Sequence, residues 1–553
     1  MLQVIEQSHD PVISELRKNY ISPSETIAAV DPVVRRILKT RPLIVIDVNT
    51  GSLCDGPEQI RIFKASPTFK ELVSSLTRDG ERIREVVERF FGYVMFSHVW
   101  HRDGEPSFQE VDKVKSVWKL PDMPQNEKLR NFCKETRKLG HNWAWSDTCC
   151  IDKTKSSILD QSLASMYEWY ANSVATLVFL AGVAHPSKPG DLTRSLWMTR
   201  AWTLQELLSP KVIFFYDAQW KLYLGNTGAN HKESPAILQE LADAIMIPPG
   251  TIASFSPDDL GVREKLRLAS TRNATVDEDV AYSLIGIFKS DLRPHYGEGA
   301  DALGHLLDEI VARSGEVTVL TWSGESSSYN SCLPASLRVY SQTPYSPSSL
   351  EGEEMERRIE ELSVKFHRQQ ARTIFNEINR LPPARFATRR LYLPCIVFSV
   401  KNLEMLHPIS SPRLFSDEKL YRARVSGLGQ VEFTTADRLS LNGPQQLVFA
   451  HPWIHYIRGP SGGITWEDDS ESDTDSDSAE VAPLPAVPAL QVDHYTRALE
   501  MIARLGQPFS ALLLMKQPSG EYRRVAAENE IVVPGLGTNI TSKNIRARVL
   551  EIL

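Results

Sequence analysis

The chain has 553 residues, of which 42% are hydrophobic and 24% charged. This length exceeds that of one compact domain and the composition is typical of globular proteins, so we expect two or three folded parts. The net charge is −7, but residues 467–480 alone hold eight carboxylates, so the rest of the chain is nearly neutral. A folded part without a positive excess argues against a nucleic-acid-binding protein.

The cysteines and the apolar runs further limit the classes of protein to which the chain can belong. Six cysteines in so long a chain, without a CxxC pair, predict neither a disulfide scaffold nor a zinc site. The N-terminal residues have no apolar signal-peptide core. The longest apolar run, residues 174–184, is shorter than the ~20 residues that cross a bilayer. We therefore expect an intracellular, cytoplasmic protein with no membrane span and no metal.

The first half of the chain alternates strand and helix patterns. Residues 1–41 are expected to form an N-terminal helical extension. Apolar runs then predict strands, and apolar residues at helical spacing predict helices between them. Such alternation with short joints predicts an α/β fold, an open parallel sheet flanked by helices. The expected strands are residues 42–48, 93–100, 143–151, 175–181 and 211–216, and the expected helices are 69–91, 157–172 and 195–208.

The second half predicts a β-rich α+β region. Helical segments are expected at 262–270, 276–289 and 300–313, and a highly charged helix at 350–381 with Met355, Ile359, Leu362 and Phe366 on one stripe. Residues 389–455 alternate like β-strands. The predicted parts are the extension 1–41, an α/β domain 42–325, a charged helix with a β-rich region 326–458, a disordered acidic linker 459–490, and a C-terminal α+β segment 491–553.

Two motifs resemble chemical sites but favour simpler readings. Gly459–Gly463 matches the GxSxG pattern of serine hydrolases, yet it opens the acidic linker and not a strand-to-helix turn. His98 and His101 are three apart, but at the end of a strand they diverge, and no third ligand is near. We expect neither a serine nucleophile nor a metal site here.

Four ordered segments carry the most specific signal: Tyr93–Trp100 (YVMFSHVW), Trp145–Lys153 (WSDTCCIDK), Trp197–Leu207 (WMTRAWTLQEL), and Asp277–Gly299 with its EDVAYSLIGIF and YGEG blocks. Their order and spacing resemble the fungal heterokaryon-incompatibility (HET) domain over about residues 42–325. The sequence departs from the family pattern at His98, His101 and Asp152-Lys153, which stand for an aromatic residue, a glycine and Asn-Gln.

HET domains are similar to Toll/interleukin-1 receptor (TIR) domains, which implies a TIR-like core at about residues 90–220. In catalytic TIR domains, a glutamate on the helix after the third strand is needed to cleave NAD at the nicotinamide–ribose bond. The resemblance places Glu206 at that position as the catalytic candidate. NAD is then a possible substrate, with no other cofactor. We expect substrate-binding roles for Trp202 and Arg200 beside Glu206, and for Ser97, Trp100 and Asp147 at the carboxyl ends of the strands.

The residue types at these positions suit this chemistry, but structural roles for the same residues stay open. Trp202 and Glu206 are four residues apart, so on a helix they share one face. An indole can stack on a planar ring, and a carboxylate can stabilise an oxocarbenium-like charge. The alternative is that these residues have structural roles. Trp202 is then a core residue and Glu206 a partner of Arg200. Ser97 is a small packing residue, and Asp147 is an acceptor for loop amides.

The resemblance implies a protein of fungal non-self recognition that triggers regulated cell death. Two mechanisms stay open. The domain either cleaves NAD once it is clustered, or acts as a non-catalytic adaptor that signals by homotypic oligomerisation. The implied partners are further copies of the chain and an incompatibility or NLR-type protein. No P-loop and no repeat is visible in the sequence.

Overall fold

The computed structural model describes residues 21–75, 79–406, 419–441, 443, 446–453, 494–536 and 546–553. The chain divides into two compact units. Unit 1 comprises Met1–Gly261 and Thr271–Gly297, and unit 2 comprises Val262–Ser270 and Glu298–Leu553. Among the described residues, no helix combines the length and apolar character needed to cross a membrane. The predicted acidic linker and the GxSxG motif lie outside the described residues.

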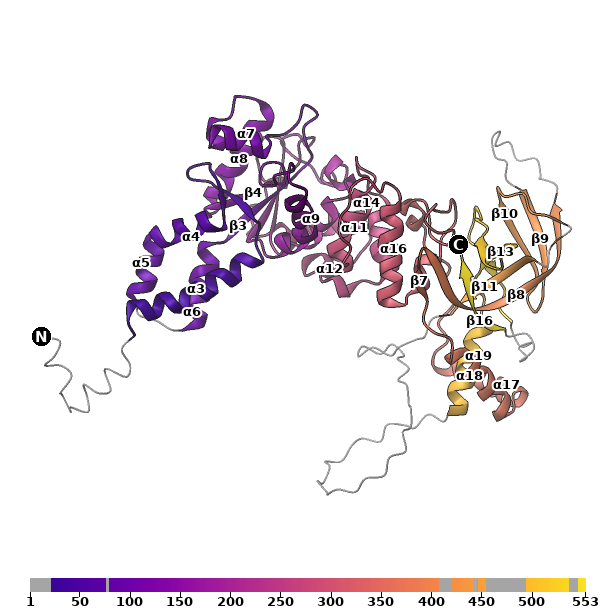
Figure 1. The fold of residues 1–553 in the computed structure, drawn as a ribbon. Helices are drawn as coiled ribbons and strands as arrows, with labels where there is room; N and C mark the ends of the chain where they lie inside the picture. The colour runs from indigo at the N-terminus through magenta and orange to yellow at the C-terminus, as the bar shows by residue number, and fades with distance from the viewer. Residues whose placement is uncertain are drawn as a thin grey trace, which may run out of the picture. The chain divides into compact units, whose positions relative to one another are not determined.

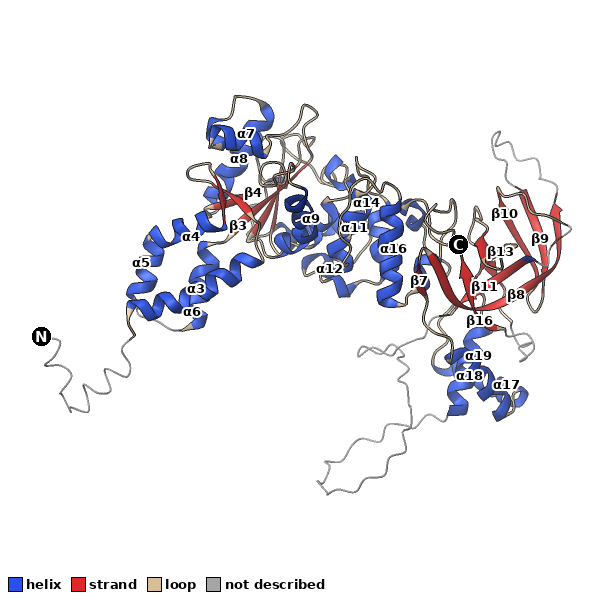
Figure 2. Ribbon diagram, viewed as in Figure 1, coloured by secondary structure: helices blue, strands red, loops and turns tan. Residues whose placement is uncertain are grey.

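Unit 1 is built on a six-stranded sheet of order β2-β1-β4-β3-β5-β6. Figures 1 and 2 label β3 and β4 of this sheet. The neighbouring strands β4, β3, β5 and β6 run parallel to one another, as predicted. The hairpin of β1 and β2 adds to β4 in antiparallel orientation. The strands are β1 Ile44–Asp47, β2 Leu53–Asp55, β3 Tyr93–His98, β4 Trp143–Trp145, β5 Ala175–Phe179 and β6 Ile213–Tyr216.

Helices complete unit 1 (Figure 2). They are α3 Pro23–Lys39, α4 Gly56–Ala65, α5 Pro67–Ser74, α6 Gly80–Phe90, α7 Phe108–Val114, α8 Pro124–Lys138, α9 Ser156–Ala171, α10 Thr203–Leu208, α11 Pro235–Ile245, α12 Pro249–Ala253, α14 Asp279–Tyr282 and α15 Ile285–Phe288. Short 3-10 turns include η1 Val117–Lys119 and η2 Leu196–Thr199. The helices α3, α5 and α6 pack on one another around their own small apolar core.

Successive side chains of β3 point to opposite faces of the sheet and show which helix lies on each face. Phe96 stacks on Phe132 of α8, with ring centroids 4.4 Å apart. On the opposite face, the hydroxyl of Ser97 points to α10, whose residue Glu206 accepts its hydrogen bond. All six residues of β3 are buried, which explains why its sequence is apolar almost throughout instead of alternating.

Several predicted elements of unit 1 are wrong in extent, among them the helices 69–91 and 276–289, which are α5 with α6 and α14 with α15. Two further differences bear on the site. The predicted helix 195–208 is broken: Arg200 is extended and its backbone bridges to Asn273, so only η2 and the short α10 are helical. The predicted strand 143–151 ends at Trp145, because the chain turns there and the amide of Cys150 donates to the carbonyl of Ser146. Both breaks depend on backbone hydrogen bonds that apolar spacing does not report.

Unit 2 holds an eight-stranded sheet in which β10-β9-β8-β11-β13-β14-β16 form one path and β7 pairs with β8. The strands are β7 Arg385–Ala387, β8 Arg390–Leu406, β9 Lys419–Val425, β10 Gly429–Thr435, β11 Leu447–Pro452, β13 Leu512–Lys516, β14 Tyr522–Arg524 and β16 Ala547–Ile552, while β12 Phe509–Ser510 and β15 Val532–Val533 pair separately. The predicted β-rich C-terminal region is therefore confirmed. Strands from 326–458 and 491–553, predicted as separate parts, share this sheet.

The helices of unit 2 include α13 Val262–Ser270, α16 Asp301–Ser314, α17 Gly352–Lys365, α18 Arg368–Asn379 and α19 His494–Leu505, with turns η6 Val317–Leu320 and η7 Leu337–Ser341. The predicted charged helix 350–381 is in fact two helices, because the chain is extended at Phe366 and His367. Three residues of its apolar stripe, Met355, Leu362 and Phe366, are buried in the core of unit 2, and Ile359 packs against that core.

Candidate functional site

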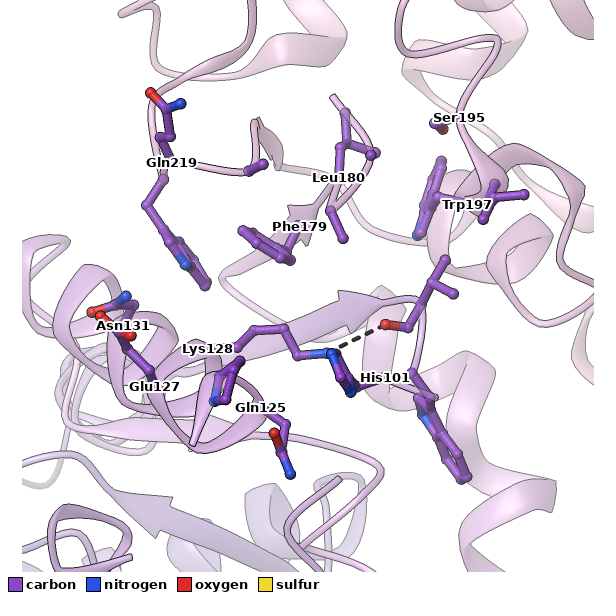
Figure 3. Close-up of a pocket in the computed structure, with 18 of the residues that line it drawn as sticks. His101, Gln125, Glu127, Lys128, Asn131, Phe179, Leu180, Ser195, Trp197 and Gln219 are labelled. Atoms are coloured by element: carbon purple, nitrogen blue, oxygen red, sulfur yellow. Dashed lines mark hydrogen bonds between the residues drawn. The ribbon is translucent and has the colours of Figure 1, made fainter. Parts of the chain in front are cut away.

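A cleft of about 1000 Å³ opens at the carboxyl edge of the parallel strands of unit 1 (Figure 3). Its walls come from the segments that follow β3, β5 and β6, from α8, and from the start of η2. This is where the open parallel sheets of α/β proteins bind their ligands. The lining of the cleft includes the aromatic residues Trp100, Phe179, Trp197 and Trp220 and the cationic residues Arg102, Lys128, Lys134, Lys138 and Lys221.

The cleft combines aromatic surface with cations, although Asp103, Glu127 and Glu135 also line it. Phe179 and Trp220 stack with their ring centroids 4.8 Å apart. Lys128 donates to the carbonyl of Val99 (3.3 Å; Figure 3) and to the carboxylate of Glu105. Lys138 pairs with Glu135 at 2.6 Å. Flat apolar rings beside cations suit a ligand that carries a planar ring and negative groups.

Glu206 lies beneath this cleft and is not among the described residues that line it. Its carboxyl accepts a hydrogen bond from the hydroxyl of Ser97. The hydroxyl of Tyr170 lies close enough to interact with this carboxyl and donates to the carbonyl of Phe96 at 3.2 Å. The indole N–H of Trp197 in turn donates to the oxygen of Ser97 at 2.6 Å. Because Trp197 lines the cleft and is only 1% exposed, its indole and Ser97 stand between the cleft and Glu206.

Burial raises the pKa of Glu206 to about 8. The negative charge of Asp147 raises this pKa further, while the hydrogen bonds from Ser97 and Tyr170 and the charge of Arg272 lower it. Arg272 is itself buried, which lowers its pKa to about 10, and its guanidinium donates to the hydroxyl of Thr203 at 2.7 Å. Glu206 as a residue is partly exposed, and its carboxyl is harder to ionise than a carboxyl in water.

Trp100 and Asp147 come together at the rim of the cleft. The indole N–H of Trp100 donates to the carboxylate of Asp147 at 2.9 Å, and the ammonium of Lys153 lies 4.0 Å from the Trp100 ring. The ring of His98 lies 3.5 Å from Asp147 and 3.8 Å from Glu105. Burial opposes ionisation of Asp147, but His98, Lys153 and Trp100 together lower its pKa.

Trp202 and Arg200 lie in a different environment. The indole of Trp202 packs on the core of unit 1 and bonds to the carboxylate of Asp279, which also accepts from the hydroxyl of Tyr296 at 2.8 Å. Arg200 donates to the hydroxyl of Thr275 at 3.0 Å. The third and fourth sequence segments thus meet through Trp202 and Asp279, and Arg200 is directed to Thr275, just before the fourth segment, and not to Glu206.

The structure therefore divides the predicted site residues into three groups. Ser97 and Glu206 touch beneath the cleft, Trp100 and Asp147 touch at its rim, and Arg200 and Trp202 face Asp279 and Thr275. Trp197, Arg272 and Tyr170 were not singled out as site residues from the sequence. Trp197 heads the third segment, so its place in that block was the available signal. Arg272 precedes the fourth segment and had none.

The comparisons with known proteins agree with the sequence motifs. The family described as "Heterokaryon incompatibility protein (HET)" matches residues 93–191, which contain β3, β4, α9 and β5. The vegetative incompatibility protein HET-E-1 of Podospora anserina is 31% identical over 228 residues, which cover 39% of this chain and 16% of that protein. No solved structure matches the chain.

The resemblance to the HET domain is thereby confirmed for this region. The chain spans only about a sixth of the length of the relative that it matches.

Proposed function

We propose that this protein is an incompatibility effector that triggers regulated cell death when its copies cluster, and that unit 1 then cleaves NAD. The observation that carries the chemical part is the cleft at the carboxyl edge of the sheet, about 1000 Å³ in volume, with Glu206 directly beneath it. NAD carries two planar rings and a pyrophosphate, which the aromatic and cationic lining would suit.

The reaction needs no partner reagent other than water. The bond between the ribose carbon and the nicotinamide nitrogen breaks, and its electron pair leaves with nicotinamide. Water adds to the ribose carbon and loses a proton, which gives ADP-ribose. An ionised carboxylate near that carbon stabilises the positive charge that develops on the ribose. Glu206 is the carboxyl proposed for this role.

The test uses the purified full chain, free and clustered on a multivalent tag, incubated with NAD. We expect nicotinamide release from the clustered form and its loss, on the order of 100-fold, in E206Q. The matched control is Glu168→Gln, an exposed glutamate on α9, which should leave release unchanged. Absence of release from the clustered wild type, with the protein folded, would reject the enzymatic part of the proposal.

A second candidate function, the non-catalytic adaptor, is favoured by a specific observation. Two large apolar side chains at the cleft, Trp100 and Leu196, are 48% and 71% exposed. Such side chains are suited to contact a second copy of the chain. In that case E206Q would still kill cells on expression, whereas replacing Leu196 by aspartate would abolish both clustering and death.

A further inference from the structure

Unit 2 has a cavity of its own, of about 280 Å³. Its walls come from η6 and Thr321, from residues 347–350, from the end of β11 up to Trp453, and from residues between 504 and 512, which run from the last turn of α19 to the start of β13. Pockets for drug-sized ligands measure about 300–1,000 Å³. This cavity is slightly smaller, so it has room for a small molecule or for one residue at the end of a chain.

The walls of this cavity are held in place by contacts with one another. The ring of His451 stacks on that of Phe509, with the centroids 3.9 Å apart and the planes 10° from parallel. The side-chain amide of Gln507 donates to the carbonyl of Ser348 at 2.6 Å. The cavity is therefore preformed, and a ligand would not have to order its walls.

The inside of the cavity is apolar and its opening is polar. The lining residues that are buried are all apolar: Val317, Leu350, Leu505, Phe509 and Leu512. The lining residues that are exposed are 347–349, which include two serines, and Pro508. Because burial of apolar surface is favourable, this arrangement selects a ligand with an apolar body.

Arg504 gives the cavity a single positive charge. This residue belongs to the last turn of α19, is partly exposed, and forms no hydrogen bond or ion pair through its side chain in the part of the chain that is described. The described lining contains no aspartate, glutamate or lysine. Burial lowers the pKa of His451 to about 4, so its ring is neutral at physiological pH. The guanidinium is thus available to a carboxylate of the ligand, to which it can donate two parallel hydrogen bonds.

We propose that this cavity binds a small carboxylic acid with an apolar body, with the carboxylate on Arg504 and the body among the buried apolar side chains. A single guanidinium balances the one charge of a carboxylate, whereas a phosphate group carries up to two. The stacked rings of His451 and Phe509 suit an aryl or branched aliphatic body. Binding here does not depend on NAD cleavage by unit 1, because all the lining residues belong to unit 2.

Two sources can present this chemistry, a free organic acid and the C-terminal residue of a protein chain. The experiment therefore uses the full chain and two probes, 3-phenylpropanoate and a hexapeptide that ends in phenylalanine. Each probe is paired with its carboxamide, which has nearly the same shape but no charge. Saturation-transfer NMR and isothermal titration calorimetry measure binding. We expect at least one of the acids to bind, and its amide to bind ~10-fold or more weakly. Binding of one acid alone identifies the source, and binding of both supports the shared chemistry.

A substitution at Arg504 ties the binding to this cavity. R504Q should weaken binding of the acid ~10-fold or more. The matched control is R497Q, which should bind as the wild type does, since Arg497 lies on the same helix but does not line the cavity. The amide comparison needs no variant, so it tests the proposal even if circular dichroism shows that R504Q does not fold. Amides that bind as tightly as the acids, unchanged binding by folded R504Q, or no binding of either acid to the folded wild type would each overturn the proposal.

Discussion

At the scale of single residues, Glu206 shows what the sequence could and could not provide. Its block, its helix and its proximity to Ser97 could be anticipated from the motif order. The tryptophan expected beside it was Trp202, which instead bonds to Asp279. The indole that matters is Trp197, because the predicted helix breaks at Arg200 and η2 turns this ring toward Ser97. Helical spacing cannot reveal a break caused by a backbone bridge to residue 273.

The raised pKa of Glu206 predicts a measurable dependence of stability on pH. Between its ordinary pKa of 4.5 and the folded value of about 8, the unfolded chain loses this proton while the folded chain keeps it. The contribution of Glu206 to the free energy of unfolding therefore falls as pH rises through this window, by roughly 1 kcal/mol per pH unit. In E206Q this term is absent, so its stability relative to the wild type should increase from pH 5 to pH 8.

Thermal midpoints of both proteins at several pH values check this prediction. Glu127→Gln is the control, because Glu127 is exposed on α8 and its replacement should shift the midpoint by the same small amount at every pH. A gap between E206Q and the wild type that stays constant with pH would mean that the carboxyl of Glu206 is already in contact with water.

At the scale of elements, apolar runs identified the strands, but close contacts between helices could not be foreseen. Gly286 stands in the IGIF run of α15, where its lack of a side chain has no visible reason in the sequence. In the structure, α15 packs on α9, and a Cβ at Gly286 would lie 2.0 Å from the Cβ of Tyr167. Real Cβ contacts are never that short, so the two helices would have to separate.

Gly286→Ala is therefore expected to lower the free energy of unfolding by about 1–3 kcal/mol, the usual cost of overpacking. Gly250→Ala in α12 is the matched control, since no heavy atom lies within 4 Å of its would-be Cβ and alanine favours a helix. Denaturant unfolding of the two variants measures the difference. Equal stability of both would show that α15 does not pack on Tyr167 in solution.

At the scale of the whole molecule, the order of parts along the chain differs from their grouping in space. The predicted α/β domain ran from 42 to 325, whereas unit 1 ends at Gly297 and Val262–Ser270 belongs to unit 2. There α13 packs on η7, and the guanidinium of Arg263 lies over the ring of Tyr340 and donates to the carbonyl of Gln342 at 2.7 Å. The sequence predicted a helix at residues 262–270, but it did not indicate on which unit this helix packs.

This exchange makes a prediction about where the chain can be cut. A fragment of residues 1–297 keeps α13 but removes η7, so Leu266, Leu268 and Ala269, all buried in the full chain, would lose their partners. Exposed apolar surface of this kind promotes association, so the fragment should elute as aggregates in size-exclusion chromatography with light scattering. Replacing residues 262–270 in the same fragment by nine glycine and serine residues should restore a monomer. A monodisperse 1–297 fragment that melts at the same temperature as its linker version would show that α13 is stable without unit 2, and that the boundary can be placed on either side of it.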